Sequence, residues 1–153
     1  TPTTNNSNTP LVKVASPPTA STWGIENPTT ALRDIKGSAK AQRVEFRIGA
    51  ADANPYLTAA ATLGAGLLGI AAKLPLGDAI QGNAYEVQDS LPSAQQLPAN
   101  LLDATRAFEA SDAAIELFGQ AFVEHFAASR KWEVREYERH LNDWQLKRYF
   151  EII

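Results

Sequence analysis

The chain has 153 residues, of which 44% are hydrophobic, and a formal net charge of -3. This length and composition are typical of a single globular domain and exclude disorder throughout. The small charge and the lack of a basic run argue against a nucleic-acid partner. The absence of cysteine excludes disulfides and thiolate metal sites, and it fits a cytoplasmic location, which we expect for this protein.

The first half of the chain predicts a tail followed by strands. Residues 1–20 are rich in Thr, Asn, Ser and Pro and predict a loop or tail. Because the chain starts at Thr1 and contains no methionine, we interpret its start as a cut and not as a native N-terminus. Residues 21–50 carry the predicted strands. Thr22–Ile25 and Ala31–Ile35 flank a turn-prone segment, which indicates a hairpin or a strand-loop-strand unit.

The hexamer 43–48 alternates strictly between charged and apolar residues. Successive side chains of a strand point to opposite faces, so the apolar residues share one face and Arg43, Glu45 and Arg47 share the other. On an isolated strand such a face is a solvated surface with ion pairs of about 0–1 kcal/mol each. On a covered sheet, its arginines could clamp phosphate or carboxylate oxygens while the glutamate holds a hard divalent cation.

The second half of the chain predicts helices. A helix is expected over residues 54–74, with Asn54 as N-cap and Pro55 at its first position. Its middle carries no charge, but it is rich in Ala and Gly and only weakly hydrophobic, so we predict a buried helix and no membrane span. After a linker-like stretch, residues 98–153 predict a helical layer that begins at Pro98.

Five blocks of the sequence, in this order and spacing, resemble the C-terminal core of glutamine synthetases. They are Trp23-Gly24-Ile25-Glu26-Asn27, Ala31-Leu32-Arg33, Gln42 to Arg47, Ala51 to Leu57, and Gly66 to Ile70. The resemblance covers residues 22–74 specifically and the rest of residues 1–153 more weakly. It implies an α+β fold, the C-terminal portion of a glutamine synthetase-type catalytic domain, with a few antiparallel strands of its barrel sheet and a helical C-terminal layer.

The resemblance also implies an activity and a site. In this family, ATP phosphorylates the γ-carboxylate of glutamate, and an amine, normally ammonia, then displaces the phosphate. By position, Arg33 and Arg43 would bind the nucleotide or phosphate, and Arg47 would hold the substrate carboxylate. Arg33 and Arg47 would be the catalytic residues, and Glu45 would ligate Mg²⁺ or Mn²⁺.

Two further expectations follow from the resemblance. The family's remaining metal ligands lie in regions upstream of the matching part, so we expect the isolated chain to be inactive. We also expect the full-length protein to form a homo-oligomer.

Three prolines depart from the family pattern. Pro28 stands where the family has an arginine that helps to neutralise the transferring phosphate. Asn8-Thr9-Pro10-Leu11 stands where the family has Tyr-Lys-Arg-Leu, and Pro17 stands in the place of a glutamate that takes a proton from ammonium. Because Pro17 removes this proton acceptor, we expect ammonia to be a poor substrate and larger amines such as polyamines to be preferred. The alternative is a non-catalytic relative with an assembly or binding role.

Overall fold

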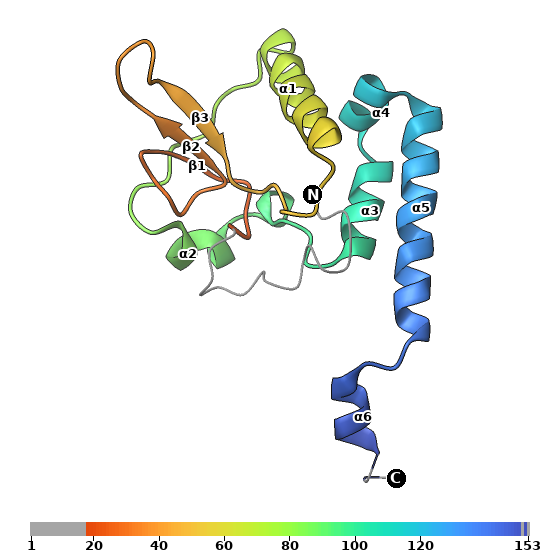
Figure 1. Cartoon of the computed structure of the whole chain (residues 1–153). Helices are drawn as coiled ribbons and strands as arrows, with labels where there is room; N and C mark the ends of the chain where they lie inside the picture. The colour runs from red at the N-terminus through yellow and green to blue at the C-terminus, as the bar shows by residue number, and fades with distance from the viewer. Residues whose placement is uncertain (1–17, 151, 153) are drawn as a thin grey trace.

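The computed structural model describes residues 18–150 and Ile152, which form an α+β fold (Figure 1). The predicted fold class is therefore confirmed, whereas Pro10, Pro17 and most of the predicted tail lie outside the described residues. The elements in chain order are β1 (Trp23–Ile25), β2 (Leu32–Ile35), β3 (Arg43–Phe46), α1 (Pro55–Ala71), α2 (Ala84–Val87), the 3-10 helices η2 (Gln88–Ser90) and η3 (Ser93–Gln95), α3 (Leu101–Glu109), α4 (Asp112–Phe118), α5 (Gln120–Arg139) and α6 (Asp143–Tyr149).

The sheet has three strands with β2 in the middle, antiparallel to β3 and parallel to β1. The expectation of antiparallel strands therefore holds for β2 and β3 only. The prediction of a hairpin between the first two strands is wrong, because these strands are parallel, and the strand-loop-strand alternative is confirmed. Parallel neighbours usually need a crossover of about a dozen residues. Here β1 has only three residues, so a short loop suffices to return the chain to the start of β2.

The loop between β1 and β2, residues 26–31, is held by the buried side chain of Asn27. Its Nδ2 donates to the carbonyls of Ile80 and Gly82 at 3.2 and 2.8 Å, and its Oδ1 accepts from the backbone and hydroxyl of Thr29. These bonds use both ends of the amide, which satisfies a buried polar group. Asn27 therefore fixes the loop to the segment that follows α1.

The segment expected to be a linker, residues 76–97, is instead structured and packs along β1. The backbone N–H of Ile80 donates to the carbonyl of Trp23 at 2.9 Å, and the indole N–H of Trp23 donates to the carbonyl of Gly77 at 2.8 Å. The elements α2, η2 and η3 follow in the same segment. The backbone carbonyl and the indole N–H of Trp23 thus gain partners that the sequence pattern did not indicate.

Helix α1 begins where the sequence predicts. The side chain of Asn54 accepts from the backbone N–H groups of Tyr56 and Leu57, and Pro55 takes the first helical position. The predicted burial is wrong for this chain, because no residue of α1 is buried and Leu67 is 66% exposed. Among the described elements, α1 packs closely only against α4. None of the described helices combines the length and the apolar character that a membrane crossing requires.

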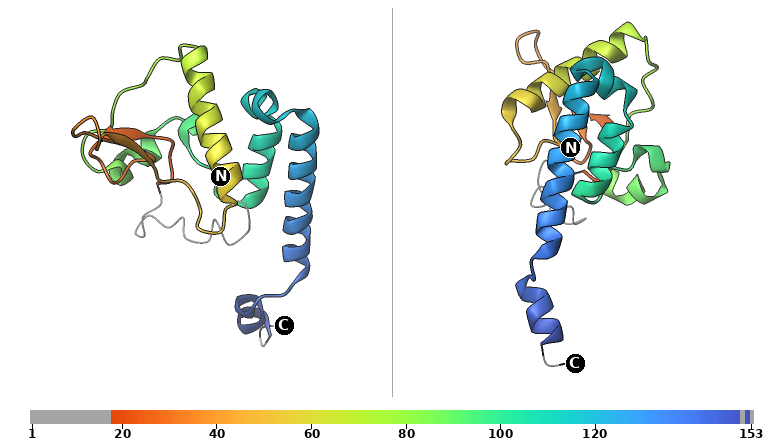
Figure 2. Two further views of the ribbon diagram at one scale, coloured as in Figure 1. Left: turned by 45° about the horizontal axis from the view of Figure 1, so that its top comes forward. Right: turned by 90° about the vertical axis from the view of Figure 1, so that its right-hand side faces the viewer.

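Helices α3, α4 and α5 form the helical layer beside α1 (Figures 1 and 2). Helix α3 begins at Leu101 behind the N-cap Asn100, and not at Pro98, because the Asn100 side chain accepts from a first-turn N–H. Leu101 and Val123 are fully buried between α3 and α5. Helix α6 lies apart from the other elements beyond the end of α5 (Figures 1 and 2).

The close approach of the loop to β1 predicts a specific intolerance at Gly24. A Cβ atom at this position would lie 2.8 Å from the Cβ of Asn27 and 3.1 Å from the carbonyl oxygen of Ile80. Gly24→Ala should therefore lower the free energy of unfolding by about 1–3 kcal/mol, the usual cost of overpacking. Gly77→Ala is the matched control, because a Cβ there meets nothing within 4 Å. Urea titration checks both variants, and equal stability would contradict the packing described.

Candidate active site

The charged face of the sheet brings Arg33, Glu45 and Arg47 together. The register of β2 and β3 places Arg33 directly opposite Glu45. One carboxylate oxygen of Glu45 lies 3.5 Å from Nη1 of Arg33, and the other lies 3.9 Å from Nε of Arg47. A single carboxylate therefore stands between two guanidinium groups, but these belong to Arg33 and Arg47 and not to Arg43 and Arg47, the pair that the alternation indicated.

Arg47 also connects this face to the loop after β1. Its backbone N–H donates to the carbonyl of Ala31 at 2.9 Å, which extends the ladder between β2 and β3 by one residue. Its Nη1 donates to the carbonyls of Pro28 and Thr30. The side chain is only 20% exposed. Arg47 is therefore held in a fixed orientation by groups on both sides.

Arg43 shares the charged face but lies apart from the other three groups. It stands opposite Ile35, at the end of β3 nearest the turn, and its Nη1 donates to the carbonyl of Ala41 at 3.0 Å. No acidic side chain of the described region forms an ion pair with it. Arg43 is exposed, so its guanidinium remains accessible to an anion in solution.

A further charged residue, Glu26, joins the site although the sequence did not single it out. Its Oε2 lies 3.1 Å from Nη2 of Arg33, and its Oε1 accepts from the backbone N–H of Lys36 at 2.8 Å. Glu26 has a φ of 51°, a left-handed conformation that costs a non-glycine residue about 1–2 kcal/mol. Neither propensity nor spacing indicates such a backbone in advance, so this contact could not be predicted.

The four side chains form an alternating row of charges, in the order Glu26, Arg33, Glu45 and Arg47. They are between 20% and 46% exposed, and pairs with this exposure contribute little to stability, about 0–1 kcal/mol each. The row therefore orients its guanidinium groups more than it stabilises the fold. Nε of Arg33 is buried and has no hydrogen-bond partner in the described part of the chain.

The residues present fit one ligand of a divalent cation but not a complete metal site. A carboxylate such as Glu45 is the donor that Mg²⁺ prefers. However, the described residues contain no group of three or more His, Cys, Asp or Glu side chains placed to hold a metal ion. Within the described residues, Glu45 can therefore contribute only part of a coordination shell.

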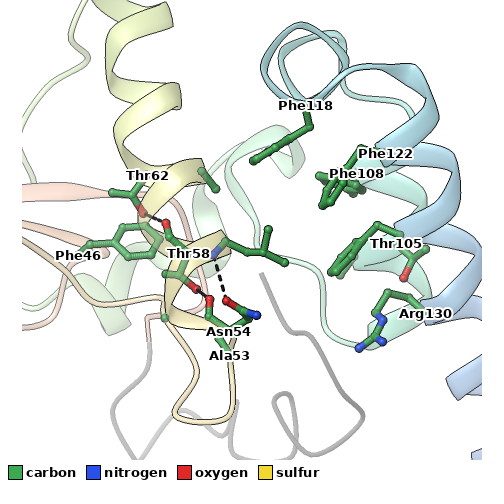
Figure 3. A pocket seen from close by; sticks show the side chains of 15 residues that line it. Phe46, Ala53, Asn54, Thr58, Thr62, Thr105, Phe108, Phe118, Phe122 and Arg130 are labelled. Carbon is green, nitrogen blue, oxygen red and sulfur yellow. Dashed lines mark hydrogen bonds between the residues drawn. The ribbon is translucent and has the colours of Figure 1, made fainter.

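A separate cavity of about 100 Å³ lies on the other side of β3, between α1 and the helical layer (Figure 3). Phe46 of β3 and a cluster of phenylalanines from α3 to α5 line it. The hydroxyls of Thr58, Thr62 and Thr105 all donate to carbonyls of their own helix or its cap. The lining of this cavity is mainly apolar and suited to packing, and the chemistry-bearing groups lie on the charged face.

Comparisons of the sequence with family models and with known proteins agree on one family. The family model for the catalytic domain of glutamine synthetase matches residues 1–149. Type-1 glutamine synthetase 2 of Dictyostelium discoideum is 43% identical over 137 residues, which are 89% of this chain and 26% of that protein. Glutamate–isopropylamine ligase of a Pseudomonas species is 44% identical over 133 residues, which are 87% of this chain and 28% of that protein.

A solved structure agrees with these sequence relationships. A GmaS–ADP complex superimposes with a TM-score of 0.78 at 33% identity, over 97% of this chain and 34% of that one. The chain thus spans about a quarter to a third of the length of these relatives. Since the family model matches nearly the whole chain, and the fold agrees with a solved member at this identity, the chain belongs to the glutamine synthetase catalytic-domain family.

Proposed function

We propose that the protein containing this chain is an ATP-dependent carbon–nitrogen ligase that joins the γ-carboxylate of glutamate to an amine through γ-glutamyl phosphate. The observation that carries the proposal is the grouping of Arg33, Glu45 and Arg47 on one face of the sheet. The named activity of the Pseudomonas relative, a glutamate–isopropylamine ligase, supports this substrate class. In this proposal the chain supplies the C-terminal portion of the catalytic domain.

The arginines would bind the anionic parts of the substrates. Phosphoryl transfer leaves little covalent chemistry to the protein, so catalysis depends on positioning and on neutralising the phosphate charge. Arg33 and Arg43 are the proposed contacts of the nucleotide or the transferring phosphate. A guanidinium group suits this task because its planar set of N–H donors matches phosphate oxygens. Arg43 forms no ion pair with any described residue. It can therefore bind a nucleotide without breaking an existing ion pair.

Arg47 is proposed to hold the carboxylate of glutamate. Its hydrogen bonds to the carbonyls of Pro28 and Thr30 fix the plane of the guanidinium. An arginine whose orientation is set in advance binds a carboxylate with less loss of side-chain entropy. Together, Arg33 and Arg47 are the proposed catalytic residues, because both would touch the reacting groups.

Glu45 is proposed as one ligand of Mg²⁺ or Mn²⁺. When bound, the divalent cation would neutralise negative charge on the phosphates of ATP. Since the described residues contain no group of three or more His, Cys, Asp or Glu side chains that could hold a metal ion, the remaining ligands would have to come from other parts of the protein. The isolated chain is therefore inactive in this proposal.

The choice of amine in this proposal follows from the proline at position 17, whereas Pro28 bears on catalysis with any amine. Pro28 presents its carbonyl to Arg47, but its ring cannot supply the positive charge that the family has at this place. One such stabilising group is worth about 2.7–4 kcal/mol in the transition state. Ammonia is disfavoured by Pro17, which stands in the place of the glutamate that takes a proton from ammonium. We propose a larger amine, such as a polyamine, as the substrate.

Pro28 also favours a second candidate function. If the missing charge abolishes phosphoryl transfer, the protein would be a non-catalytic relative that retains the fold for assembly or binding. In both cases we propose that the protein is cytoplasmic and acts as a homo-oligomer, as its chemistry and family suggest.

The metal role of Glu45 predicts a specific change in cation dependence. Glu45→Gln keeps the size of the side chain but removes its charge, so the Mg²⁺ concentration needed for half-maximal activity should rise by about tenfold or more, a cost seen even for outer-sphere partners. Titration of activity with Mg²⁺ in the full-length protein checks this.

Val44→Thr is the matched control for this titration, because Val44 lies on the opposite face of β3 and is 64% exposed. It should leave the cation dependence unchanged, and any effect should appear in the melting temperature. The metal assignment would be wrong if Glu45→Gln lowered the melting temperature and left the Mg²⁺ titration as it was.

The amine assignment predicts an order of substrates. With ATP, Mg²⁺ and glutamate supplied, kcat/KM for putrescine should exceed that for ammonium by about tenfold or more, since even one methylene group in a fitted apolar pocket gives about tenfold. Phosphate release by the full-length protein measures both rates. Faster turnover with ammonium would refute the substrate assignment, and no turnover with any amine would support the non-catalytic alternative.

A further inference from the structure

We propose that Glu26 is a positioning residue for Arg33, a role that rests on the nucleotide site proposed above. The contact between Nη2 of Arg33 and Oε2 of Glu26, 3.1 Å, is shorter than the 3.5 Å contact between Nη1 and Glu45. Each terminal nitrogen of the guanidinium therefore faces one carboxylate. Because each of these nitrogens carries two hydrogens, one N–H on each is left for an anionic ligand.

Glu26 is itself held in place by the strand that carries Arg33. Its Oε1 accepts from the backbone N–H of Lys36 at 2.8 Å, and its own backbone N–H donates to the carbonyl of Asp34 at 2.9 Å. Both partners are backbone groups in or directly after β2. The carboxylate of Glu26 therefore keeps a constant position relative to Arg33.

The backbone of Glu26 gives independent support for a functional role. Glu26 adopts a φ of 51°, a conformation that glycine adopts without cost. Strained residues of this kind persist where the surrounding structure holds them, and they cluster at functional sites. Here the left-handed turn brings the carboxylate back over β2, where it reaches Arg33.

The two carboxylates that face Arg33 have different tasks in this arrangement. In the proposed function, Glu45 binds a divalent cation, which would weaken its attraction for Arg33. Glu26 would then remain as the partner that keeps the guanidinium aimed at the phosphate. The sequence carries no other acidic residue in the loop 26–31 that could take over this task.

The test compares Glu26→Gln with Asp34→Asn in the full-length protein. Both variants remove one carboxylate charge near β2, but Asp34 forms its ion pair with Lys36 and lies on the opposite face of the strand, across from Val44. Three quantities are measured for each variant. They are the steady-state constants for ATP, the melting temperature, and the rate at which phenylglyoxal modifies Arg33, followed by mass spectrometry.

Glu26→Gln should raise KM for ATP by about fivefold, the range expected for a partly exposed pair, with little change in kcat or melting temperature. It should also speed the modification of Arg33, because the guanidinium is released from one side. Asp34→Asn should change neither KM for ATP nor the rate at which Arg33 is modified. Equal effects of the two variants, or a Glu26→Gln effect confined to the melting temperature, would overturn the proposal.

A failure of the ligase assignment can be recognised separately. If the unchanged protein shows no ATP-dependent turnover with any amine, the proposed function fails, and the modification rate of Arg33 alone decides the role of Glu26. Equal modification rates in Glu26→Gln and in the unchanged protein would then refute positioning by Glu26.

Discussion

Arg33 stands opposite Glu45 because β2 and β3 pair in one register, and the whole charged face depends on this pairing. A slip of one residue would move every side chain of β3 to the other face of the sheet. The turn between the strands helps to hold the register, since the N–H groups of Ala41 and Gln42 both donate to the carbonyl of Ser38. The hydrogen bonds of Arg47 to the loop 26–31 hold the register at the other end of the strands.

The same register gives β3 a second, apolar face with different surroundings. Phe46 points toward α1 and the cavity that the phenylalanine cluster lines (Figure 3). Val44 and most large apolar side chains of α1 remain exposed to solvent, and no described residue covers them. The chain therefore has a well-ordered charged face but an apolar side that is only partly packed.

How far the sequence predicts this structure depends on whether the cause of each feature is local. The start of α1 could be predicted because Asn54 and Pro55 act on the first helical turn, and the faces of β3 because alternation alone sets them. The parallel pairing of β1 depends on its loop, which the distant residues Ile80 and Gly82 hold in place. The exposure of α1 depends on how the helices pack together, so the sequence pattern indicated neither feature. Arg33 entered the site through a family resemblance, and Glu26 was missed because its left-handed backbone leaves no signal in the sequence.

The central claim is that the charged face of β2 and β3 binds the phosphates of a nucleotide together with a divalent cation. A crystal structure of the full-length protein with ADP and Mn²⁺, with the metal located by its anomalous scattering, tests this most directly. We expect Mn²⁺ within coordination distance of Glu45 and a phosphate group against Arg33. Nucleotide and metal bound elsewhere, with Glu45 still paired to Arg33 and Arg47, would contradict the account.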